Sequence, residues 1–355
     1  MSGAARATAP PGGIGAPIPI VVRSVNDQPP SRPESLAPSE PLAVPAADGF
    51  TVKGSVWRHP DSNPGRPVVV INPATSVRCR YYFPFAAFLF EHGFDVIAYD
   101  YRGIGESRPP ALRGFDACWI DWGRLDFDAV LRHAARSFPG QPIDAVAHSI
   151  GGFVLGLAES NHLLRRVFTV GAQYAYWRDY IAGRRLRMFW KWHVTVPLLT
   201  LLFGYLPGKR LGWLEDTPRG VVRDWVLSRP RFEDTWRGSS SVRYPDKQAL
   251  VRQFAAVTAP TLAVSVTDDE FGTVPAIERL LAYFSGSRRT HLRISPQSIG
   301  EPSIGHFAFF HGRFERKLWG IPLEWLRSGR LPEGCPGEVV GTREGSGASR
   351  SLLAG

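Results

Sequence analysis

The sequence predicts an α/β fold in which a mostly parallel, doubly wound sheet carries a helical cap insertion. Two observations support this fold class. Short apolar and β-branched runs alternate with stretches of helical periodicity along most of the chain. One long segment interrupts this alternation and contains more than half of the tryptophans. With 355 residues, the chain is long enough for one large domain with an insertion.

Six runs have the composition of strands, and several are apolar on both faces, as buried parallel strands are. They are residues 68–72, 95–99, 143–147, 166–170, 261–266 and 291–295. Helical periodicity covers residues 81–92, 120–137, 150–160, 275–284 and 312–327. Such alternation implies helices on both faces of one sheet, and sheets of this kind bind ligands beyond the carboxyl ends of their strands.

The interrupting segment, residues 174–245, shows no strand pattern, and arginines are interleaved with its tryptophans. We predict a mostly helical cap over the functional edge of the sheet; an ordinary helical pair packed on the domain is the alternative. Within it, residues 195–210 (TVPLLTLLFGYLPGKR) join an apolar stretch to a basic end. Contact with a membrane surface is one interpretation, but a lid helix packed on the core is the favoured one.

The two ends of the chain differ from the middle in composition. Residues 1–48 are rich in Pro, Ala, Ser and Gly, and residues 329–355 have a similar composition. We predict that both are disordered tails around a folded domain of residues 49–328.

Charge and cysteine content narrow the partners and the compartment. The net charge is +10, most of it from arginine, which is typical of a solvated basic surface. There is no zinc-ligand spacing and no RNA-binding signature, so we predict no nucleic-acid partner. Three cysteines without a framework and the lack of a convincing signal peptide indicate a reducing, cytoplasmic location.

Residues 143–154 (IDAVAHSIGGFV) place Ser149 between a predicted strand and a predicted helix. Small residues stand two positions before and after the serine, at Ala147 and Gly151. A serine on so tight a turn needs small neighbours, because larger side chains would collide with the adjacent strand and helix. The helix N-terminus also stabilises developing negative charge. Ser149 is therefore a candidate nucleophile; a helix N-cap is the alternative.

A serine nucleophile requires a base, and the base must be oriented by a third group. Asp268 and Asp269 end the strand predicted at 261–266, and His306 lies in the loop after the strand at 291–295. We favour Asp269 as the acid because Phe271 can pack beneath its loop, whereas Asp268 would cap the turn.

Two other histidines are weaker candidates for the base. His311 lies in or beside the following helix, and His148 adjoins the serine but should point away from it.

The oxyanion of an acyl-transfer reaction needs at least two N–H donors. One is expected from the backbone of Ile150, directly after the serine. The second is expected from the loop that follows the strand at 68–72, where Pro73 has no N–H to offer. Ala74 is the first choice and Thr75 the second.

Residues 93–107 (GFDVIAYDYRGIGES) add the pattern D-x-R-G-x-G-x-S. Together with AHSIGG, this segment resembles the α/β-hydrolase superfamily, in its lipase, esterase and serine aminopeptidase-like branch. The resemblance covers most of residues 50–327 and gives Asp100, Arg102 and Gly103 structural roles. It implies a Ser–Asp–His triad, with no metal and no organic cofactor.

Further stretches are similar to a bacterial group of predicted α/β hydrolases of unassigned substrate: VGAQYAYWRDY, FGYLPGKRLG and TDDEF followed by IGHFAFF. Two departures from the common pattern stand out. Ala147 replaces the first glycine of the elbow, and Asn72-Pro73 stands where His-Gly is common. Neither removes an atom that the chemistry requires, so they bear on substrate choice.

The sequence thus predicts a serine hydrolase that cleaves a small-molecule carboxylic ester with an apolar acyl or alkyl group. One alternative is a serine aminopeptidase-like peptidase, which would need acidic residues of the cap to hold an amine; Glu215, Asp216 and Asp224 are available. Acyl transfer on the same scaffold is a second alternative, and a non-catalytic binding protein is a third. The oligomeric state is not predicted.

Overall fold

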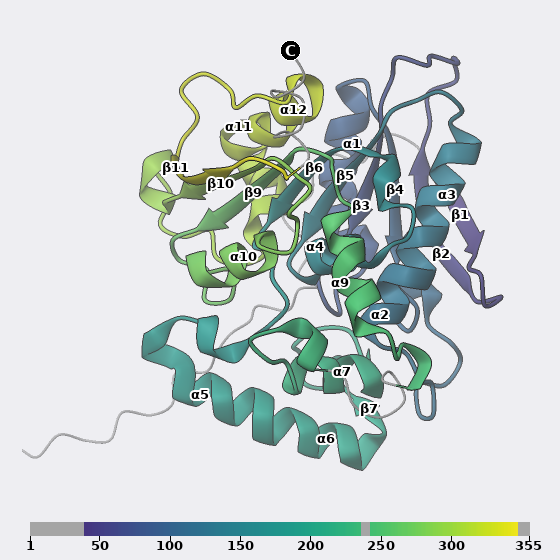
Figure 1. The fold of residues 1–355 in the computed structure, drawn as a ribbon, viewed down its shortest axis with the longest axis vertical. Coiled ribbons are helices and arrows are strands. Elements are labelled where there is room, and N and C mark those ends of the chain that lie inside the picture. Colours follow the sequence, from purple (N-terminus) through teal and green to yellow (C-terminus); the bar gives the residue numbers. More distant parts are fainter. Residues whose placement is uncertain (1–38, 236–241, 347–355) are drawn as a thin grey trace, which may run out of the picture.

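The computed structural model describes residues 39–235 and 242–346 (Figure 1). A nine-stranded sheet in the order β1-β2-β4-β3-β5-β6-β9-β10-β11 runs through the molecule. Its six central strands are parallel, which confirms the predicted fold class. They are β4 (Asp95–Asp100), β3 (Val68–Asn72), β5 (Ile143–His148), β6 (Leu164–Val170), β9 (Thr261–Val266) and β10 (Arg289–Ile294).

Three antiparallel strands extend the edges of this sheet: β1 (Glu40–Pro45), β2 (Thr51–Trp57) and β11 (Glu338–Arg343). The prediction of disorder is therefore wrong for residues 40–45 and 338–343. The other residues of the predicted tails include 1–38 and 347–355, which lie outside the described part of the chain. Leu42 and Val44 are buried, but β11 is largely exposed, so main-chain pairing with β10 holds it and its composition gives no signal.

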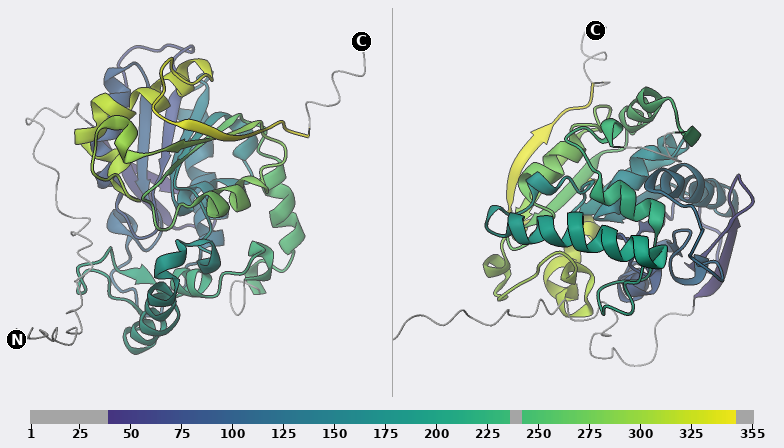
Figure 2. Two further views of the ribbon diagram at one scale, coloured as in Figure 1. Left: turned by 90° about the vertical axis from the view of Figure 1, so that its left-hand side faces the viewer. Right: turned by 90° about the horizontal axis from the view of Figure 1, so that it is seen from below.

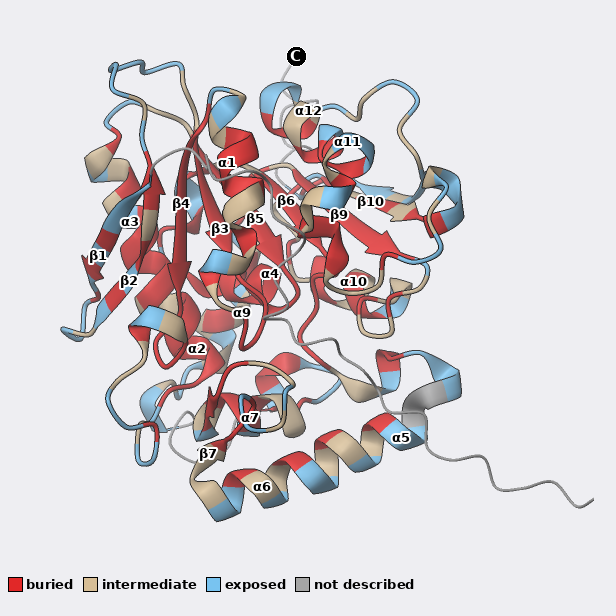
Figure 3. Ribbon diagram, turned by 180° about the vertical axis from the view of Figure 1, so that it is seen from behind, coloured by how far each residue is buried: buried red, intermediate tan, exposed pale blue. Residues whose placement is uncertain are grey.

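Helices cover both faces of the sheet, and Figure 3 shows the buried strands between them. Their apolar side chains form two cores, one on each side. The first core receives α3 (Asp128–Ser137), α4 (Ile150–Leu157), α9 (Lys247–Ala255) and α10 (Val274–Leu281). The second receives α1 (Phe83–Glu91), α11 (Glu315–Leu318) and α12 (Gly320–Ser328).

The turn after β4 is fixed by ionic and hydrogen-bonding contacts of the buried side chains Asp100 and Arg102. Arg102 donates from Nε to Asp126 at 2.7 Å and from a terminal nitrogen to Asp48 at 2.6 Å. Asp126 lies in the π-helix Trp122–Phe127, which joins the short helix α2 (Trp119–Asp121) to α3. Asp100 accepts bonds from the backbone N–H groups of Cys79 and Glu106. These contacts agree with structural roles for this segment.

The described parts of the cap, residues 174–235 and 242–245, lie beyond the carboxyl ends of the parallel strands (Figures 1 and 2). Its longest element is a continuous helix, here called the outer cap helix, made of α5 (Arg185–Trp190), the π-helix Lys191–Thr195 and α6 (Val196–Phe203). Helix α7 (Arg219–Val226) packs inside it. The cap also contains two two-residue strands that no sequence pattern predicts, β7 (Tyr205–Leu206) and β8 (Thr217–Pro218), which pair antiparallel.

One face of the outer cap helix is exposed, as the pale blue bands of Figure 3 show, and this face carries apolar side chains. Leu201 is 71% exposed and Leu202 is 68% exposed. The other exposed apolar side chains on this helix are Leu186, Trp190, Val194 and Leu198. Among the described residues, no helix is long and apolar enough to cross a membrane.

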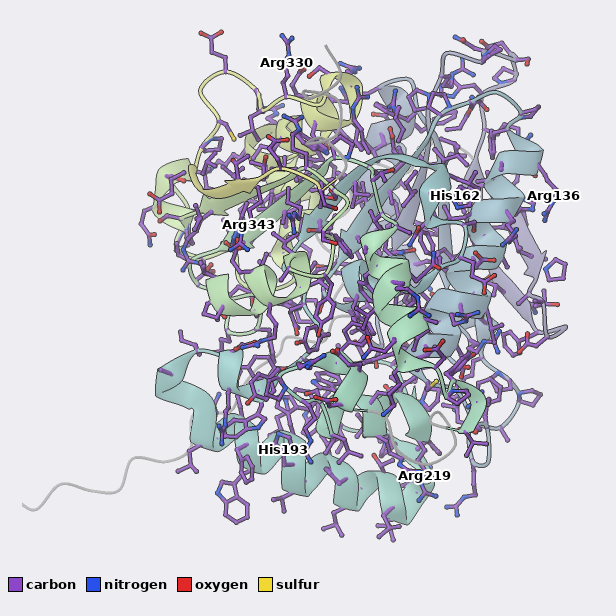
Figure 4. The ribbon with its side chains drawn as sticks, viewed as in Figure 1. Arg136, His162, His193, Arg219, Arg330 and Arg343 are labelled. Carbon is purple, nitrogen blue, oxygen red and sulfur yellow. The ribbon has the colours of Figure 1, made fainter. Side chains whose placement is uncertain are left out.

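Basic side chains are spread over the molecule. Figure 4 labels Arg136 on α3, Arg219 in the cap, Arg330 after α12 and Arg343 on β11. These positions fit the interpretation of the positive charge as a solvated surface.

Candidate active site

Ser149 occupies a sharp turn between β5 and α4, with φ 54° and ψ −121°. Positive φ is uncommon for a residue with a side chain and marks local strain. The Ser149 N–H donates to the carbonyl of Val170 in the neighbouring strand at 3.0 Å, which holds the turn to the sheet. A Cβ on Gly151 would lie 2.5 Å from the Asn72 carbonyl oxygen, so only glycine fits there. Ser149 is in the N-cap position of α4, but its side chain makes no capping bond.

The Ser149 hydroxyl instead contacts His306. The Oγ atom lies 2.9 Å from Nε2 of His306, and Nδ1 of the same ring lies 2.7 Å from Oδ2 of Asp269. A carboxylate can only accept, so Nδ1 carries the proton and Nε2 is left to accept from the hydroxyl. The structure therefore brings together the three residues that the sequence predicts as a triad.

Asp269 is buried and held in its ionised form by local donors. Burial works against its charge, but His306 and the N–H groups of Phe271 and Gly272 outweigh it and lower the pKa of this carboxyl. Those N–H groups donate to Oδ1 at 2.8 and 2.9 Å, so Oδ2 remains for the imidazole. A Cβ on Gly272 would lie 2.5 Å from Oδ2, so this glycine makes room for the carboxylate.

Asp268 has a different set of contacts. Its carboxylate accepts from the N–H groups of Ile304 and Gly305 at 2.9 and 3.0 Å, directly before His306. It thus ties the histidine loop to the end of β9. Phe271 packs beside the imidazole, with ring centroids 5.2 Å apart. Of the two aspartates, Asp269 is the one in contact with His306.

His148 points away from Ser149, as expected, and forms a buried relay that the sequence analysis missed. Its Nε2 donates to the carbonyl of His306 at 2.8 Å, and its Nδ1 accepts from the hydroxyl of Tyr82 at 2.7 Å. Burial, with His306 nearby, lowers the pKa of His148 to about 3, so the ring is neutral as this bonding requires. His311 contacts Tyr81 at 5.5 Å between ring centroids and takes no part in the relay.

The Tyr82 relay also reaches the loop after β3. The Ala74 N–H donates to the Tyr82 hydroxyl oxygen at 2.9 Å. The Thr75 N–H, by contrast, donates to no described residue. Ile150 is the first residue of α4, so its N–H has no partner within the helix. All three residues line the cavity at Ser149.

This cavity lies between the sheet and the cap. Ser149 and His306 form its floor, and the cap supplies an aromatic and apolar roof. Trp192 and Trp225 stack there with ring centroids 4.1 Å apart. The cap side chains that line the cavity are Ala175, Lys191, Trp192, Leu206, Trp213, Leu214 and Trp225. No aspartate or glutamate is among the described residues that line it.

The acidic cap residues that could hold a substrate amine are engaged elsewhere. Glu215 pairs with Arg78 at 2.7 Å and with Lys209 at 3.0 Å, and Asp216 pairs with Arg108. Asp224 accepts from the backbone N–H of Trp119. None of the three acids lines the cavity.

No cysteine is among the described residues that line the cavity. No group of three or more His, Cys, Asp or Glu side chains in the described chain could hold a metal ion. Cys79 and Cys118 are buried, and burial raises the pKa of each thiol, which disfavours the reactive thiolate.

A parallel sheet, a strained serine elbow after its central strand and a hydrogen-bonded histidine and aspartate define an α/β hydrolase. The family model described as serine aminopeptidase, S33, matches residues 63–297, and the chain belongs to this family. A search of curated protein sequences finds no match.

Solved structures agree with this fold at low identity. A soluble variant of monoglyceride lipase from Saccharomyces cerevisiae superimposes with a TM-score of 0.55 at 13% identity, over 85% of this chain and 99% of the other. The esterase Pf2001 from Pyrococcus furiosus gives 0.52 at 15% identity, over 85% and 97%. DcsB, solved with its substrate analogue, gives 0.50 at 16% identity, over 82% and 100%.

Proposed function

We propose that the protein hydrolyses carboxylic esters through Ser149, His306 and Asp269. The observation that carries this proposal is the hydrogen-bonded chain from the Ser149 hydroxyl through both imidazole nitrogens to a buried carboxylate. The strained turn that exposes the hydroxyl at the floor of a largely apolar cavity supports it further.

His306 acts as the general base. Its Nε2 takes the proton of Ser149 as the hydroxyl oxygen attacks the ester carbonyl, and Asp269 stabilises the imidazolium that forms. The imidazolium then gives its proton to the leaving alcohol, and an acyl-enzyme remains. Water, deprotonated by His306, releases the acid and restores the serine.

The oxyanion binds to backbone N–H groups. Ile150 supplies one of them from the start of α4. Because the Ala74 N–H is held by Tyr82, we favour Thr75 for the second, which reverses the order expected from sequence. One such donor is typically worth about 10²–10³ in rate.

The aminopeptidase alternative is weakened by the cavity wall. A peptide with a free amino terminus needs a carboxylate to hold the amine, and the described wall offers none. The apolar roof suits an apolar acyl or alkyl group instead. The solved relatives that are named an esterase and a monoglyceride lipase are consistent with ester chemistry on this fold.

Fluorophosphonate labelling of purified protein tests this proposal. We expect Ser149→Ala to abolish labelling and His306→Ala and Asp269→Asn to slow it strongly, the latter by up to about 10⁴-fold because the imidazole loses its orienting carboxylate. His311→Ala, which changes a histidine outside the hydrogen-bonded chain, is the control and should label normally. A series of p-nitrophenyl esters of increasing acyl length then measures which acyl length the cavity accepts best.

Labelling of Ser149→Ala at the wild-type rate would refute Ser149 as the nucleophile. No labelling of the folded wild type would favour a non-catalytic binding protein instead.

A further inference from the structure

Lys191 is the single Lys, Arg, Asp or Glu among the described residues that line the cavity. It begins the π-helix in the middle of the outer cap helix and is half-buried. Such π-helical turns are frequent at functional sites, because the extra residue per turn re-aims the side chains. The neighbouring Trp190 and Val194 are exposed on the outside, whereas Lys191 and Trp192 line the cavity.

The ammonium group of Lys191 lies near two aromatic rings. Its Nζ lies 4.3 Å from the ring centroid of Trp213 and 4.8 Å from that of Trp192, and both rings are cavity walls. Cation–π contacts of this kind attract an ammonium but do not neutralise it. Burial, with a smaller effect from Arg187, lowers the pKa of Lys191, as expected for a cation short of counter-charge.

No carboxylate of the described residues pairs with Lys191. Glu215 already has two cationic partners, Arg78 and Lys209. A partly desolvated ammonium without an anion is costly, so a structural lysine would normally extend its nitrogen into water. The wall is thus basic at one point and apolar around it.

We propose that Lys191 binds an anionic group of the substrate, so that the natural ester carries a carboxylate or a phosphate on the part that extends from Ser149 into the cap. This inference rests on the proposed ester hydrolysis for its substrate class, but the anion site is a property of the cap and can be measured separately. The proposal also agrees with the lack of carboxylates on the cavity wall. A cation at Lys191 would repel a substrate amine and attract an anion.

Matched esters test the site in the intact protein. One ester is mono-p-nitrophenyl adipate, whose other carboxyl group is free and negatively charged. The other is p-nitrophenyl methyl adipate, in which a methyl ester replaces that carboxylate. The two have the same acyl length and differ in the terminal charge. We expect wild type to prefer the anionic ester in kcat/KM, and Lys191→Met to lower that preference by about 10–100-fold, mainly through KM. Lys191→Arg, which keeps the charge, should retain most of it.

Lys209→Met is the matched control, because Lys209 pairs with Glu215 outside the cavity and should leave the preference unchanged. Added salt should reduce the wild-type preference but not the Lys191→Met rates. The p-nitrophenyl ester of ω-phosphooxyhexanoate, compared with the adipate ester, separates phosphate from carboxylate. Equal wild-type rates on charged and neutral esters, or equal losses on both in Lys191→Met, would overturn the proposal.

A binding measurement keeps this result separate from the proposed function. Quenching of tryptophan fluorescence in Ser149→Ala is titrated with monomethyl adipate and with dimethyl adipate. Tighter binding of the monoanion that disappears in Ser149→Ala/Lys191→Met supports the site even if neither ester is hydrolysed. No difference between the two compounds contradicts it whatever the catalytic result.

Discussion

At the scale of single residues, the relay from Ala74 through Tyr82 and His148 to the His306 carbonyl joins the loop after β3 to the loop that carries His306. Each step is a hydrogen bond of 2.7–2.9 Å. The relay fixes the loop after β3 to the loop that carries the base. Tyr82 therefore acts on the reaction by positioning other groups.

Tyr82→Phe removes this connection and leaves two buried partners unsatisfied. We expect kcat/KM to fall about tenfold with little change in KM, and the free energy of unfolding to fall by about 1–3 kcal/mol. Ester kinetics and thermal unfolding measure the two effects. Tyr205→Phe is the control, since no hydrogen bond of its hydroxyl to a described residue is lost.

Tyr82→Phe also tests whether the N–H of Ala74 or that of Thr75 binds the oxyanion. A rise in kcat for Tyr82→Phe would mean that the freed Ala74 N–H serves the oxyanion, and our order of the two donors would be wrong.

At the scale of elements, the contact between α7 of the cap and α2 depends on pH. Asp224 in α7 accepts from the Trp119 N–H at 2.9 Å, and burial raises the pKa of its carboxyl to about 8. An aspartate in the unfolded chain titrates near about 3.9. Between these values the folded protein holds a proton that the unfolded chain has released, so stability falls as the pH rises from about 4 to about 8.

Asp224→Asn keeps the acceptor for Trp119 and removes the titration. We expect the melting temperature of wild type to drop between about pH 6 and about pH 9 by several degrees more than that of Asp224→Asn. Scanning calorimetry in matched buffers measures it. Asp234→Asn, at an exposed aspartate of the cap, should follow wild type. Parallel curves for wild type and Asp224→Asn would contradict the prediction.

Elements differ in how well the sequence predicts them. Several of the six central strands are apolar on both faces, so composition alone locates them. The edge strands β1 and β11 contain proline or glycine, which weakens the strand signal in their composition, and β11 is held mainly by backbone pairing.

Some residues of the candidate site can be predicted from the sequence, and others cannot. Ser149, Asp269 and His306 each follow a strand in a fixed order, so the sequence locates them. The contact of Tyr82 with His148 joins positions 66 residues apart and has no local pattern. The inward direction of Lys191 depends on the phase of a helix that changes to π geometry at this residue.

At the scale of the whole molecule, the outer cap helix carries more than half of the large apolar side chains that are exposed in the described part of the chain. Monomeric proteins rarely expose large contiguous apolar patches without a use for them. For this segment the sequence favours a lid helix packed on the core over contact with a membrane surface, and the exposed face can be probed without assuming what it contacts.

We expect the protein to enhance the fluorescence of an apolar dye such as anilinonaphthalene sulfonate. The triple variant Leu198→Gln/Leu201→Gln/Leu202→Gln should lose most of this signal while its melting temperature changes little, because these side chains are already exposed in the folded state. Val339→Gln/Val340→Gln on β11 is the control. If the triple variant enhances the dye fluorescence as much as wild type does, the dye binds to another surface and the prediction is wrong.

The cap is one uninterrupted stretch of chain between β6 and β9, while the groups proposed for bond cleavage all follow strands of the sheet. Mutations in that stretch can alter what the cavity accepts without disturbing the elbow. The substrate preference can therefore change during evolution through substitutions in this single segment, while the rest of the domain stays under purifying selection. Exchange of the cap segment between homologues would transfer the substrate preference with it. The segment is therefore a suitable target for directed evolution.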